Sequence, residues 1–119
     1  MKKILVIGGG AMGSAFTIPC IDNKNKVIIT EPYSNTFIKD LSSKQKYHSA
    51  LKIKLPKKLE FKKFSKNLFK EKYDLIVISV CHKNFSDLGG KKIREWCKTN
   101  GVIMDLKNTL PSNQVDYTL

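Results

Sequence analysis

The sequence predicts an α/β fold built on a doubly wound parallel sheet, and three observations support this prediction. A short apolar, β-branched run at residues 3–7 ends in glycines, and an apolar helical pattern follows at residues 11–22. Further apolar runs then alternate with helical patterns along the chain. Runs that are apolar at nearly every position suit strands buried on both faces, as parallel strands are. We therefore expect about five strands, and right-handed crossovers predict the order 3-2-1-4-5.

The turn after the first strand carries the pattern Gly8-x-Gly10-x-x-Gly13. In this pattern Gly8 permits the tight turn, Gly10 lets a pyrophosphate approach the backbone, and Gly13 lets the helix pack closely on the sheet. The free N–H groups of the helix start, including those of Ala11 and Met12, and the positive end of the helix dipole would face the phosphates. A glycine-rich turn without a ligand is the alternative. The preceding strand and the following helix favour a Rossmann-like, dinucleotide-binding turn.

The first crossover helix, 11–22, contains Pro19. We expect this proline to kink the helix or end its regular part, because it lacks an N–H and clashes with the preceding turn. The second strand, 26–30, leads directly into Glu31. An acidic residue in this place hydrogen-bonds the adenosine ribose and repels a 2′-phosphate, so Glu31 favours NAD over NADP. The alternative is an acid that merely starts a helix before Pro32.

The middle of the chain gives weaker patterns. They predict a short helix at 34–41, a loop with some helix at 42–56, an edge strand at 59–61 and a short helix at 65–71. Ser34 or Asn35 is a candidate N-cap for the first of these helices, and Ser65 for the second, because serine and asparagine side chains accept hydrogen bonds from the first helical N–H groups.

The clearest strand after the first is 74–80, which Cys81 and His82 follow. Ligands of open α/β sheets lie at the carboxyl ends of strands, near the point where the strand order reverses. We therefore expect Val80 and Cys81 to flank the nicotinamide half of a dinucleotide. His82 is interpreted as a surface-loop histidine rather than a catalytic one, because the sequence shows no acidic partner for it.

The remaining patterns predict a helix at 86–99 and a strand at 102–105, which Lys107 follows. Lys107 is a candidate substrate-binding residue at the carboxyl end of that strand. Residues 110–119 have no strong pattern and are compatible with an irregular tail. Because 119 residues suit one domain, we expect residues 1–119 to form a single nucleotide-binding domain.

The composition excludes several classes of protein. The net charge is +12, but the lysines are scattered and form no basic helix, so we expect no nucleic-acid partner. The charge would instead draw in phosphorylated ligands. No apolar run approaches the ~20 residues of a membrane span, and the glycines cut short the run that follows Met1, so we expect a cytoplasmic protein with a mature N-terminus. Three cysteines without a CxxC pattern, and no Cys/His cluster, predict neither disulfides nor a metal site.

Four stretches resemble the N-terminal domain of NAD(P)-dependent glycerol-3-phosphate dehydrogenases. They are Ile7-Gly-Gly-Gly-Ala-Met-Gly-Ser-Ala-Phe-Thr-Ile-Pro-Cys20, Asp22-Asn23, Tyr47-His-Ser-Ala-Leu-Lys-Ile-Lys-Leu-Pro56 and Asp74-Leu-Ile-Val-Ile-Ser-Val80. The third is the most particular to this family, which usually has His-Pro where this chain has His48-Ser49. Of the family's Thr-Lys-Gly pattern after the fifth strand, which contacts the phosphorylated substrate, only Lys107 carries over.

The last third of the chain resembles a second family. Residues 73–85 and 101–111 are similar to the C-terminal domain of nucleotide-sugar dehydrogenases, which is also Rossmann-like and binds the nucleotide part of its substrate. Both resemblances imply the same fold and a nucleotide ligand, but they differ in which ligand.

The first resemblance implies the NAD-binding domain of an oxidoreductase that transfers hydride between glycerol 3-phosphate and NAD. Both families use a second, helical domain for catalysis, and the glycerol-phosphate dehydrogenases take their catalytic lysine from it. We therefore assign no catalytic residue and expect a separate helical domain or chain as partner. The alternatives are a nucleotide-sugar-binding domain and a non-catalytic module that senses a dinucleotide; the oligomeric state stays open.

Overall fold

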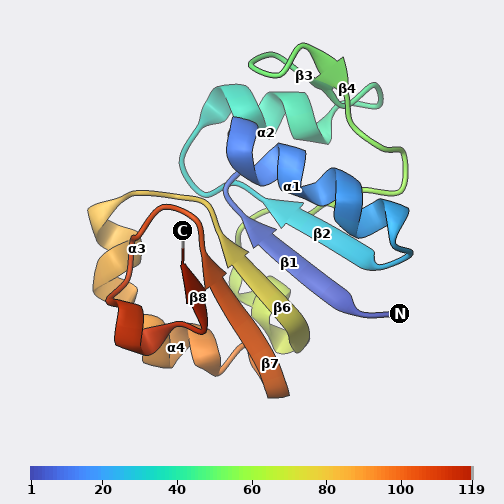
Figure 1. Ribbon diagram of the computed structural model, residues 1–119. Helices are drawn as coiled ribbons and strands as arrows, with labels where there is room; N and C mark the ends of the chain where they lie inside the picture. The colour runs from blue at the N-terminus through green and yellow to red at the C-terminus, as the bar shows by residue number, and fades with distance from the viewer. Residues whose placement is uncertain (119) are drawn as a thin grey trace.

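The computed structural model describes residues 1–118, apart from the side chain of Asn84. Its centre is a six-stranded parallel sheet (Figure 1). The strands are β1 (Lys3–Ile7), β2 (Lys26–Thr30), β5 (Glu60–Phe61), β6 (Tyr73–Ile78), β7 (Cys97–Asp105) and β8 (Tyr117–Thr118). Their spatial order is β5-β2-β1-β6-β7-β8, which confirms the predicted order 3-2-1-4-5 and adds one short strand beyond it. The order reverses between β1 and β6.

Helices cover the sheet from both sides. The helices α1 (Ala11–Asp22) and α2 (Asn35–Ser42) lie over β1 and β2, whereas α3 (Lys83–Leu88), α4 (Gly90–Arg94) and the 3₁₀ helix η1 (Lys66–Lys70) lie on the opposite face (Figure 1). Alternate residues of β1 feed the two layers of the core, because successive strand side chains point to opposite faces. Leu5 and Ile7 pack with η1, α3 and α4, and Ile4 and Val6 pack with α1 and α2.

The helix α1 has the predicted bounds, and α2 has the predicted N-cap. The helix α1 spans the predicted residues and continues past Pro19 to Asp22, so the proline does not end it. Ser34 caps α2 as predicted, since its hydroxyl accepts a hydrogen bond of 3.2 Å from the N–H of Phe37. Ser65 also precedes its helix, but its side chain makes no capping hydrogen bond.

The segment 42–56, for which a loop with some helix was expected, instead contains an antiparallel hairpin. Its strands are β3 (Tyr47–His48) and β4 (Ile53–Lys54). The hairpin gains its order from the buried His48 side chain and from the contact of β3 with α2, and neither is visible in a polar, lysine-rich sequence.

The predicted helix 86–99 is wrong in its bounds. The chain forms α3 and α4 instead, separated by Gly89 at φ +82°, a backbone conformation that favours glycine and ends a helix. The chain rejoins the sheet at Trp96, whose carbonyl accepts the N–H of Tyr73 at 3.0 Å, so β7 begins at Cys97 rather than at residue 102.

The end of the chain is more regular than the sequence pattern suggests. Residues 110–118 contain the 3₁₀ helix η2 (Ser112–Gln114) and the edge strand β8. One carboxylate oxygen of Asp116 accepts the N–H of Ile103 at 2.8 Å and a guanidinium N–H of Arg94 at 2.7 Å. Asp116 therefore ties the end of the chain to both β7 and α4.

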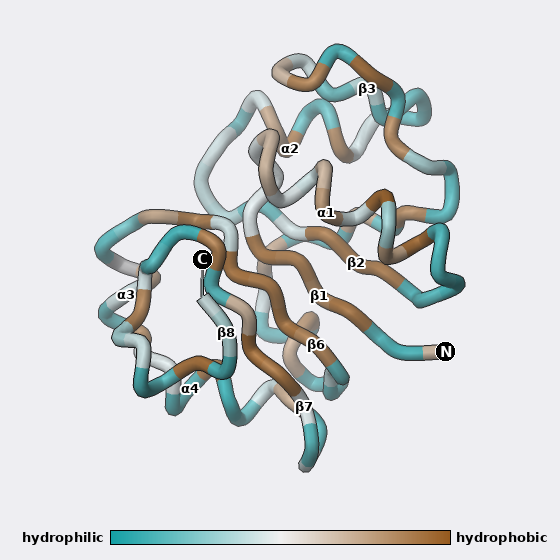
Figure 2. Tube along the Cα trace, viewed as in Figure 1, coloured by the Kyte–Doolittle hydropathy of each residue, from teal (hydrophilic) through white to brown (hydrophobic). Residues whose placement is uncertain are grey.

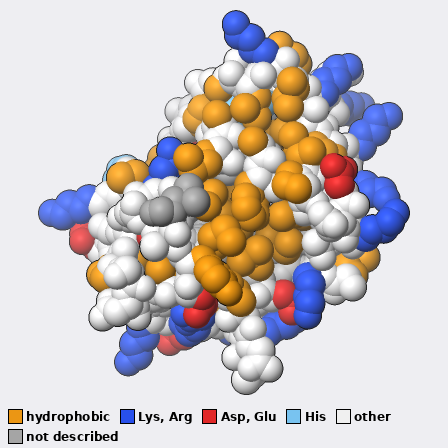
Figure 3. All heavy atoms as spheres, viewed as in Figure 1, with side chains coloured by type: hydrophobic (Ala, Val, Ile, Leu, Met, Phe, Trp, Pro, Cys, Tyr) orange, Lys and Arg blue, Asp and Glu red, His pale blue; other side chains and the backbone are white. Residues whose placement is uncertain are grey.

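One face of β6 and β7 has no helix of the described chain over it. Figure 2 shows the apolar residues concentrated along the strands, and Figure 3 shows apolar side chains gathered at the surface where these strands lie. A hollow of about 720 Å³ follows this surface, lined by the apolar residues Ile4, Leu75, Val102 and Met104 and by the polar residues Lys2, Asn25, Asp74, Lys98, Thr99 and Asn100. We refer to the four apolar residues as the bare sheet face.

Candidate functional site

A crevice opens at the carboxyl ends of the central strands, where the strand order reverses. It encloses about 350 Å³. The loops after β1, β2, β6 and β7 and the first turns of α1 and α2 supply its lining, which comprises Gly10, Ala11, Met12, Glu31, Tyr33, Ser34, Phe37, Ser79, Val80, Cys81, His82 and Lys107. In doubly wound sheets, ligands bind in the crevice formed at this switch point.

The glycines of the turn after β1 have different surroundings. Gly8 has φ +117°, and a Cβ there would lie 2.4 Å from the carbonyl oxygen of Ser79. A Cβ on Gly13 would lie 2.2 Å from the carbonyl oxygen of Gly8, so α1 packs directly on the turn. At Gly10 a Cβ would meet nothing nearer than the Phe37 ring at 3.5 Å. Gly8 and Gly13 therefore shape the turn from behind, and Gly10 leaves the crevice side open.

Both the N–H and the carbonyl of Gly9 form hydrogen bonds with side chains. Its N–H donates to Glu31 Oε1 at 2.6 Å, and its carbonyl accepts from Ser14 Oγ at 2.9 Å. The ring of His48 lies 2.7 Å from the same carbonyl through Nε2, and its Nδ1 accepts the N–H of Leu51 at 3.1 Å. The Nε2 atom therefore carries the proton and donates to Gly9. These contacts fix the backbone that leads into the first turn of α1.

His48 is a site-supporting residue whose role the sequence pattern did not reveal. The side chain is fully buried and stacks on Phe37, with ring centroids 5.1 Å apart. The only signal for it in the sequence is the family resemblance of the stretch 47–56. The structure gives that stretch a physical function, because it brings His48 under the glycine turn.

Glu31 lines the crevice but is already well hydrogen-bonded by the protein. It is 6% exposed; Oε1 accepts from Gly9, and Oε2 accepts from the N–H groups of Tyr33 at 2.9 Å and Ser34 at 3.1 Å. A carboxylate has about four acceptor positions, so three backbone donors leave one for a ribose hydroxyl. Glu31 thus joins the glycine turn to the loop before α2, and its contact with ribose stays a prediction.

An aromatic pair links the two sides of the crevice. Tyr33, after β2, stacks on His82, after β6, with ring centroids 4.0 Å apart and planes 17° from parallel. Burial and then the nearby Glu31 carboxylate raise the pKa of the Tyr33 phenol, which therefore stays a neutral hydroxyl at physiological pH. Sequence reasoning missed Tyr33, whose only signal is an aromatic residue two positions after the acid.

Most of the predicted binding residues come together here. Six line the crevice: Gly10, Ala11, Met12, Glu31, Val80 and Cys81. Lys107 lines it as well, and Gly8 and Gly13 support the turn from behind. Ser79 also lines the crevice, and its buried hydroxyl has no hydrogen-bond partner within the described residues.

Neither a metal-binding cluster nor a membrane-spanning helix is present in the described residues. Among residues 1–118, no three His, Cys, Asp or Glu side chains are grouped so that they could hold a metal ion. No helix in the described part of the chain is both long and apolar enough to cross a bilayer.

The fold and the crevice together define a class of protein. A doubly wound parallel sheet, a glycine turn that opens a helix at the switch point, and an acid after the second strand are the features of an NAD-binding domain of a dehydrogenase. The chain belongs to a particular family of that class, described as the NAD-dependent glycerol-3-phosphate dehydrogenase N-terminus, whose model matches residues 3–114. NAD is the cofactor of this family, as the glycine turn and Glu31 predict.

Solved structures agree on the fold. The putative 2-dehydropantoate 2-reductase from Enterococcus faecalis matches with a TM-score of 0.64 and 19% identity, over 89% of this chain and 34% of that one. A D-mandelate dehydrogenase with NADH and anilino(oxo)acetate matches with a TM-score of 0.61 and 18% identity, over 91% of this chain and 33% of that one. The chain therefore spans about a third of the length of these enzymes.

A nucleotide-sugar dehydrogenase is also weakly similar to this chain. UDP-N-acetyl-D-glucosamine 6-dehydrogenase from Salmonella typhi is 40% identical over 47 residues, which make up 40% of this chain and 11% of that protein. This short match lies within a much longer enzyme, so it does not indicate the function of the whole chain.

Proposed function

We propose that this domain holds NAD in the crevice and orients it for hydride transfer between glycerol 3-phosphate and NAD. The observation that carries the proposal is the family match over residues 3–114, together with a crevice open at Gly10. The N-terminus of α1 begins there, and its first N–H groups have no partner within the helix. A pyrophosphate would accept hydrogen bonds from them.

The residues around the crevice divide the binding of NAD among them. Gly10, Ala11 and Met12 would hold the pyrophosphate, and Glu31 the adenosine ribose. Val80 and Cys81 would flank the nicotinamide half. When bound, NAD supplies the hydride chemistry, so the contribution of this chain is binding and orientation.

Lys107 is the proposed contact for the phosphate of the substrate. It is exposed, follows β7 and lines the same crevice as His82. A positive charge in this place would attract a phosphorylated alcohol, and the net charge of +12 would add long-range steering.

The group that accepts the hydroxyl proton is the next part of the proposal. We propose a separate helical domain or chain that closes the opposite wall and supplies this base. A well-placed general base contributes about 10²–10⁴ in rate, and orientation within a closed cleft contributes still more. We also propose that residues 1–119 form one domain. We propose further that this domain works in the cytoplasm, and cell fractionation can test its location.

The test has two parts. Calorimetric titration of the purified chain should show binding of NAD, with NADP weaker because Glu31 repels the extra phosphate. Oxidation of glycerol 3-phosphate, followed by NADH absorbance, should be negligible for the chain alone and should appear when a helical dehydrogenase domain is added. Robust turnover by the chain alone, abolished in Lys107→Ala or His82→Ala, would show that no partner is needed. Tighter binding of NADP than of NAD would overturn the role of Glu31.

A nucleotide sugar is the second candidate ligand, favoured by the 40% identity to UDP-N-acetyl-D-glucosamine 6-dehydrogenase over a stretch of 47 residues. Titration with UDP-N-acetylglucosamine in the same calorimeter separates the two. Saturable binding of the nucleotide sugar without binding of NAD would replace the proposed function. Binding of NAD without turnover, even with a helical partner, would favour a dinucleotide sensor.

A further inference from the structure

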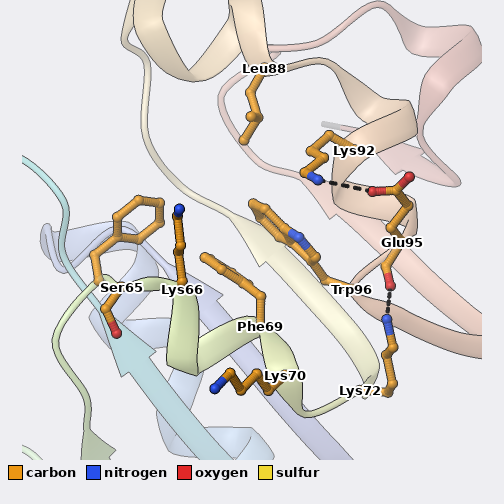
Figure 4. Close-up of a pocket in the computed structure, with 10 residues that line it drawn as sticks. Ser65, Lys66, Phe69, Lys70, Lys72, Leu88, Lys92, Glu95 and Trp96 are labelled. Carbon is orange, nitrogen blue, oxygen red and sulfur yellow. Dashed lines mark hydrogen bonds and ion pairs between the residues drawn. The ribbon is translucent and has the colours of Figure 1, made fainter.

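A second pocket lies away from the crevice, between η1 and the helices α3 and α4 (Figure 4). Its volume is about 630 Å³, within the range of about 300–1,000 Å³ that is usual for small-molecule sites. It is lined by Phe64, Ser65, Lys66, Phe69, Lys70, Lys72, Leu88, Lys92, Glu95 and Trp96. None of these residues lines the crevice.

Aromatic side chains make up its apolar wall. Phe69 and Trp96 stack with ring centroids 3.5 Å apart and planes 19° from parallel, and Phe64 meets Phe69 edge-on at 5.5 Å. In Figure 4 Lys66, Phe69 and Trp96 project into the same space, and Leu88 projects toward them from α3. Leu88 is 38% exposed although it is an apolar residue beside these rings. Trp96 is only 7% exposed, so the contact surface that the pocket offers to an apolar body comes mainly from the half-buried Phe64 and Phe69 and from Leu88.

The rim of the pocket is strongly positive. Four lysines surround the aromatic wall, against the single carboxylate of Glu95. That carboxylate is paired with Lys92 Nζ at 3.2 Å, and Lys72 Nζ donates to the Glu95 backbone carbonyl. No carboxylate in the described part of the chain pairs with Lys66 or Lys70, whose ammonium groups belong to the rim.

We propose that this pocket binds an organic anion with a flat apolar body, of the class of aryl sulfonates and aryl carboxylates. The rings would bury the apolar body, and the ammonium groups of the rim would pair with the anionic group. A neutral molecule of the same shape would lose the second contribution, and a cation would be repelled. The proposal is independent of the NAD crevice, which shares no residue with this pocket.

Trp96 provides a direct reporter, because it is the only tryptophan of the chain and lies in the pocket wall. Anilinonaphthalene sulfonate is the anionic probe, and phenylnaphthylamine is its uncharged counterpart. Titration of the folded chain with the sulfonate should quench Trp96 fluorescence to saturation. The uncharged probe should bind at least about fivefold more weakly. Equal affinity for the two probes, or no response of Trp96, would overturn the proposal.

Two charge variants should shift the affinity in opposite directions. Lys66→Met should weaken sulfonate binding about two- to fivefold, as expected for the loss of one exposed ion pair. Glu95→Gln should strengthen binding, because it frees the Lys92 ammonium. Lys44→Met, at an exposed site that does not line the pocket, should change nothing. Unchanged affinity in both Lys66→Met and Glu95→Gln would contradict an anion-binding rim.

A further pair of variants locates the probe. Leu88→Glu places a carboxylate in the pocket wall at an exposed position and should abolish sulfonate binding. Met104→Glu makes the same change on the bare sheet face and should leave Trp96 quenching intact, with circular dichroism confirming that both variants fold. The opposite result would place the probe on the sheet and refute the pocket.

Discussion

Gly10 and Gly13 lie three residues apart, yet an added methyl group would meet open space at Gly10 and a backbone oxygen at Gly13. At Gly10 the backbone has φ −68° and ψ −174°, which any residue can adopt, and the space beside it is open toward the crevice. We expect Gly10→Val to keep the fold and to lose NAD binding, by at least about tenfold. Calorimetry measures the loss. Ala15→Val, at an exposed position on α1, is the matched control. Full NAD affinity in folded Gly10→Val would contradict the binding of the pyrophosphate at this turn.

Glu31 holds two loops together before any ligand arrives, so its replacement should affect stability as well as cofactor choice. In Glu31→Gln the amide nitrogen cannot accept a hydrogen bond, and one or two of the backbone donors of Gly9, Tyr33 and Ser34 lose their acceptor. We expect a loss of about 1–3 kcal/mol in the free energy of unfolding, measured in urea. Glu60→Gln, at an exposed site on β5, should cost much less. Equal stability of the two variants would mean that the three hydrogen bonds contribute little.

At the scale of residues, the sequence predicted positions better than contacts. The glycine spacing and the place of Glu31 follow from the order of strand, turn and helix, which is a local pattern. The hydrogen bonds from Gly9 to Glu31 and from His48 to Gly9 join residues 22 and 39 positions apart, and no local pattern carries that information. The stacking of Tyr33 on His82 could not be predicted for the same reason, because it depends on how far apart the fold places two loops.

The packing of α1 on its own turn gives a prediction at the scale of elements. A Cβ on Gly13 would lie 2.2 Å from a backbone oxygen, so Gly13→Ala must push the helix away from the sheet. Such overpacking costs about 1–3 kcal/mol, which thermal or urea denaturation can measure. Gly10→Ala makes the same chemical change without the clash, and it should leave stability nearly unchanged.

Two aspartates tie neighbouring strands, and they make the sheet sensitive to acid. Asp74 accepts the N–H of Lys3 at 2.7 Å, which holds β6 to β1. This hydrogen bond, and to a lesser degree Lys98, lowers the pKa of the Asp74 carboxyl. The hydrogen bond from Arg94, and then that from Ile103, lowers the pKa of Asp116 in the same way.

Because both folded-state pKa values are below the unfolded ones, the stability that they contribute is complete above the unfolded pKa. It is lost as the pH falls through the lowered pKa of the folded state. We therefore expect the urea concentration at the unfolding midpoint to decrease as the pH is lowered from about 5 to about 2. Asp74→Asn should lower stability at neutral pH and reduce the slope in acid. A variant with the same slope as the original chain would exclude Asp74 as a source of the acid sensitivity.

At the scale of elements, the sequence predicted the five main strands and α1, because near-continuous apolar runs and a long helical period are strong local signals. It failed where tertiary contacts decide. The region 86–99 has a helical period, but Gly89 divides it, and Cys97 pairs with Tyr73 of β6 and so belongs to a strand. The short strand β8 forms because Asp116 binds Ile103 and Arg94, and two residues leave no period to read.

The bare sheet face concerns the molecule as a whole, because it determines how copies of the chain behave toward one another in solution. Ile4 is already buried, but the partly exposed side chains of Leu75, Val102 and Met104 would gain free energy by leaving water, which favours contact between molecules. A net charge of +12 opposes such contact by mutual repulsion. Colloidal stability then depends on ionic strength, because the range of that repulsion falls from about 10 Å at about 0.1 M salt to about 3 Å at about 1 M.

Light scattering should therefore report a second virial coefficient that is positive in dilute buffer and turns negative as sodium chloride is added. Met104→Lys, which places a charge on the bare sheet face, should keep the coefficient positive to higher salt, whereas the same charge placed on α1 by Ala15→Lys should have a smaller effect. Equal salt responses of the two variants would mean that the apolar face is not the surface through which the molecules attract each other. If the difference holds, this chain is kept dispersed by its lysines rather than by a polar covering of its sheet.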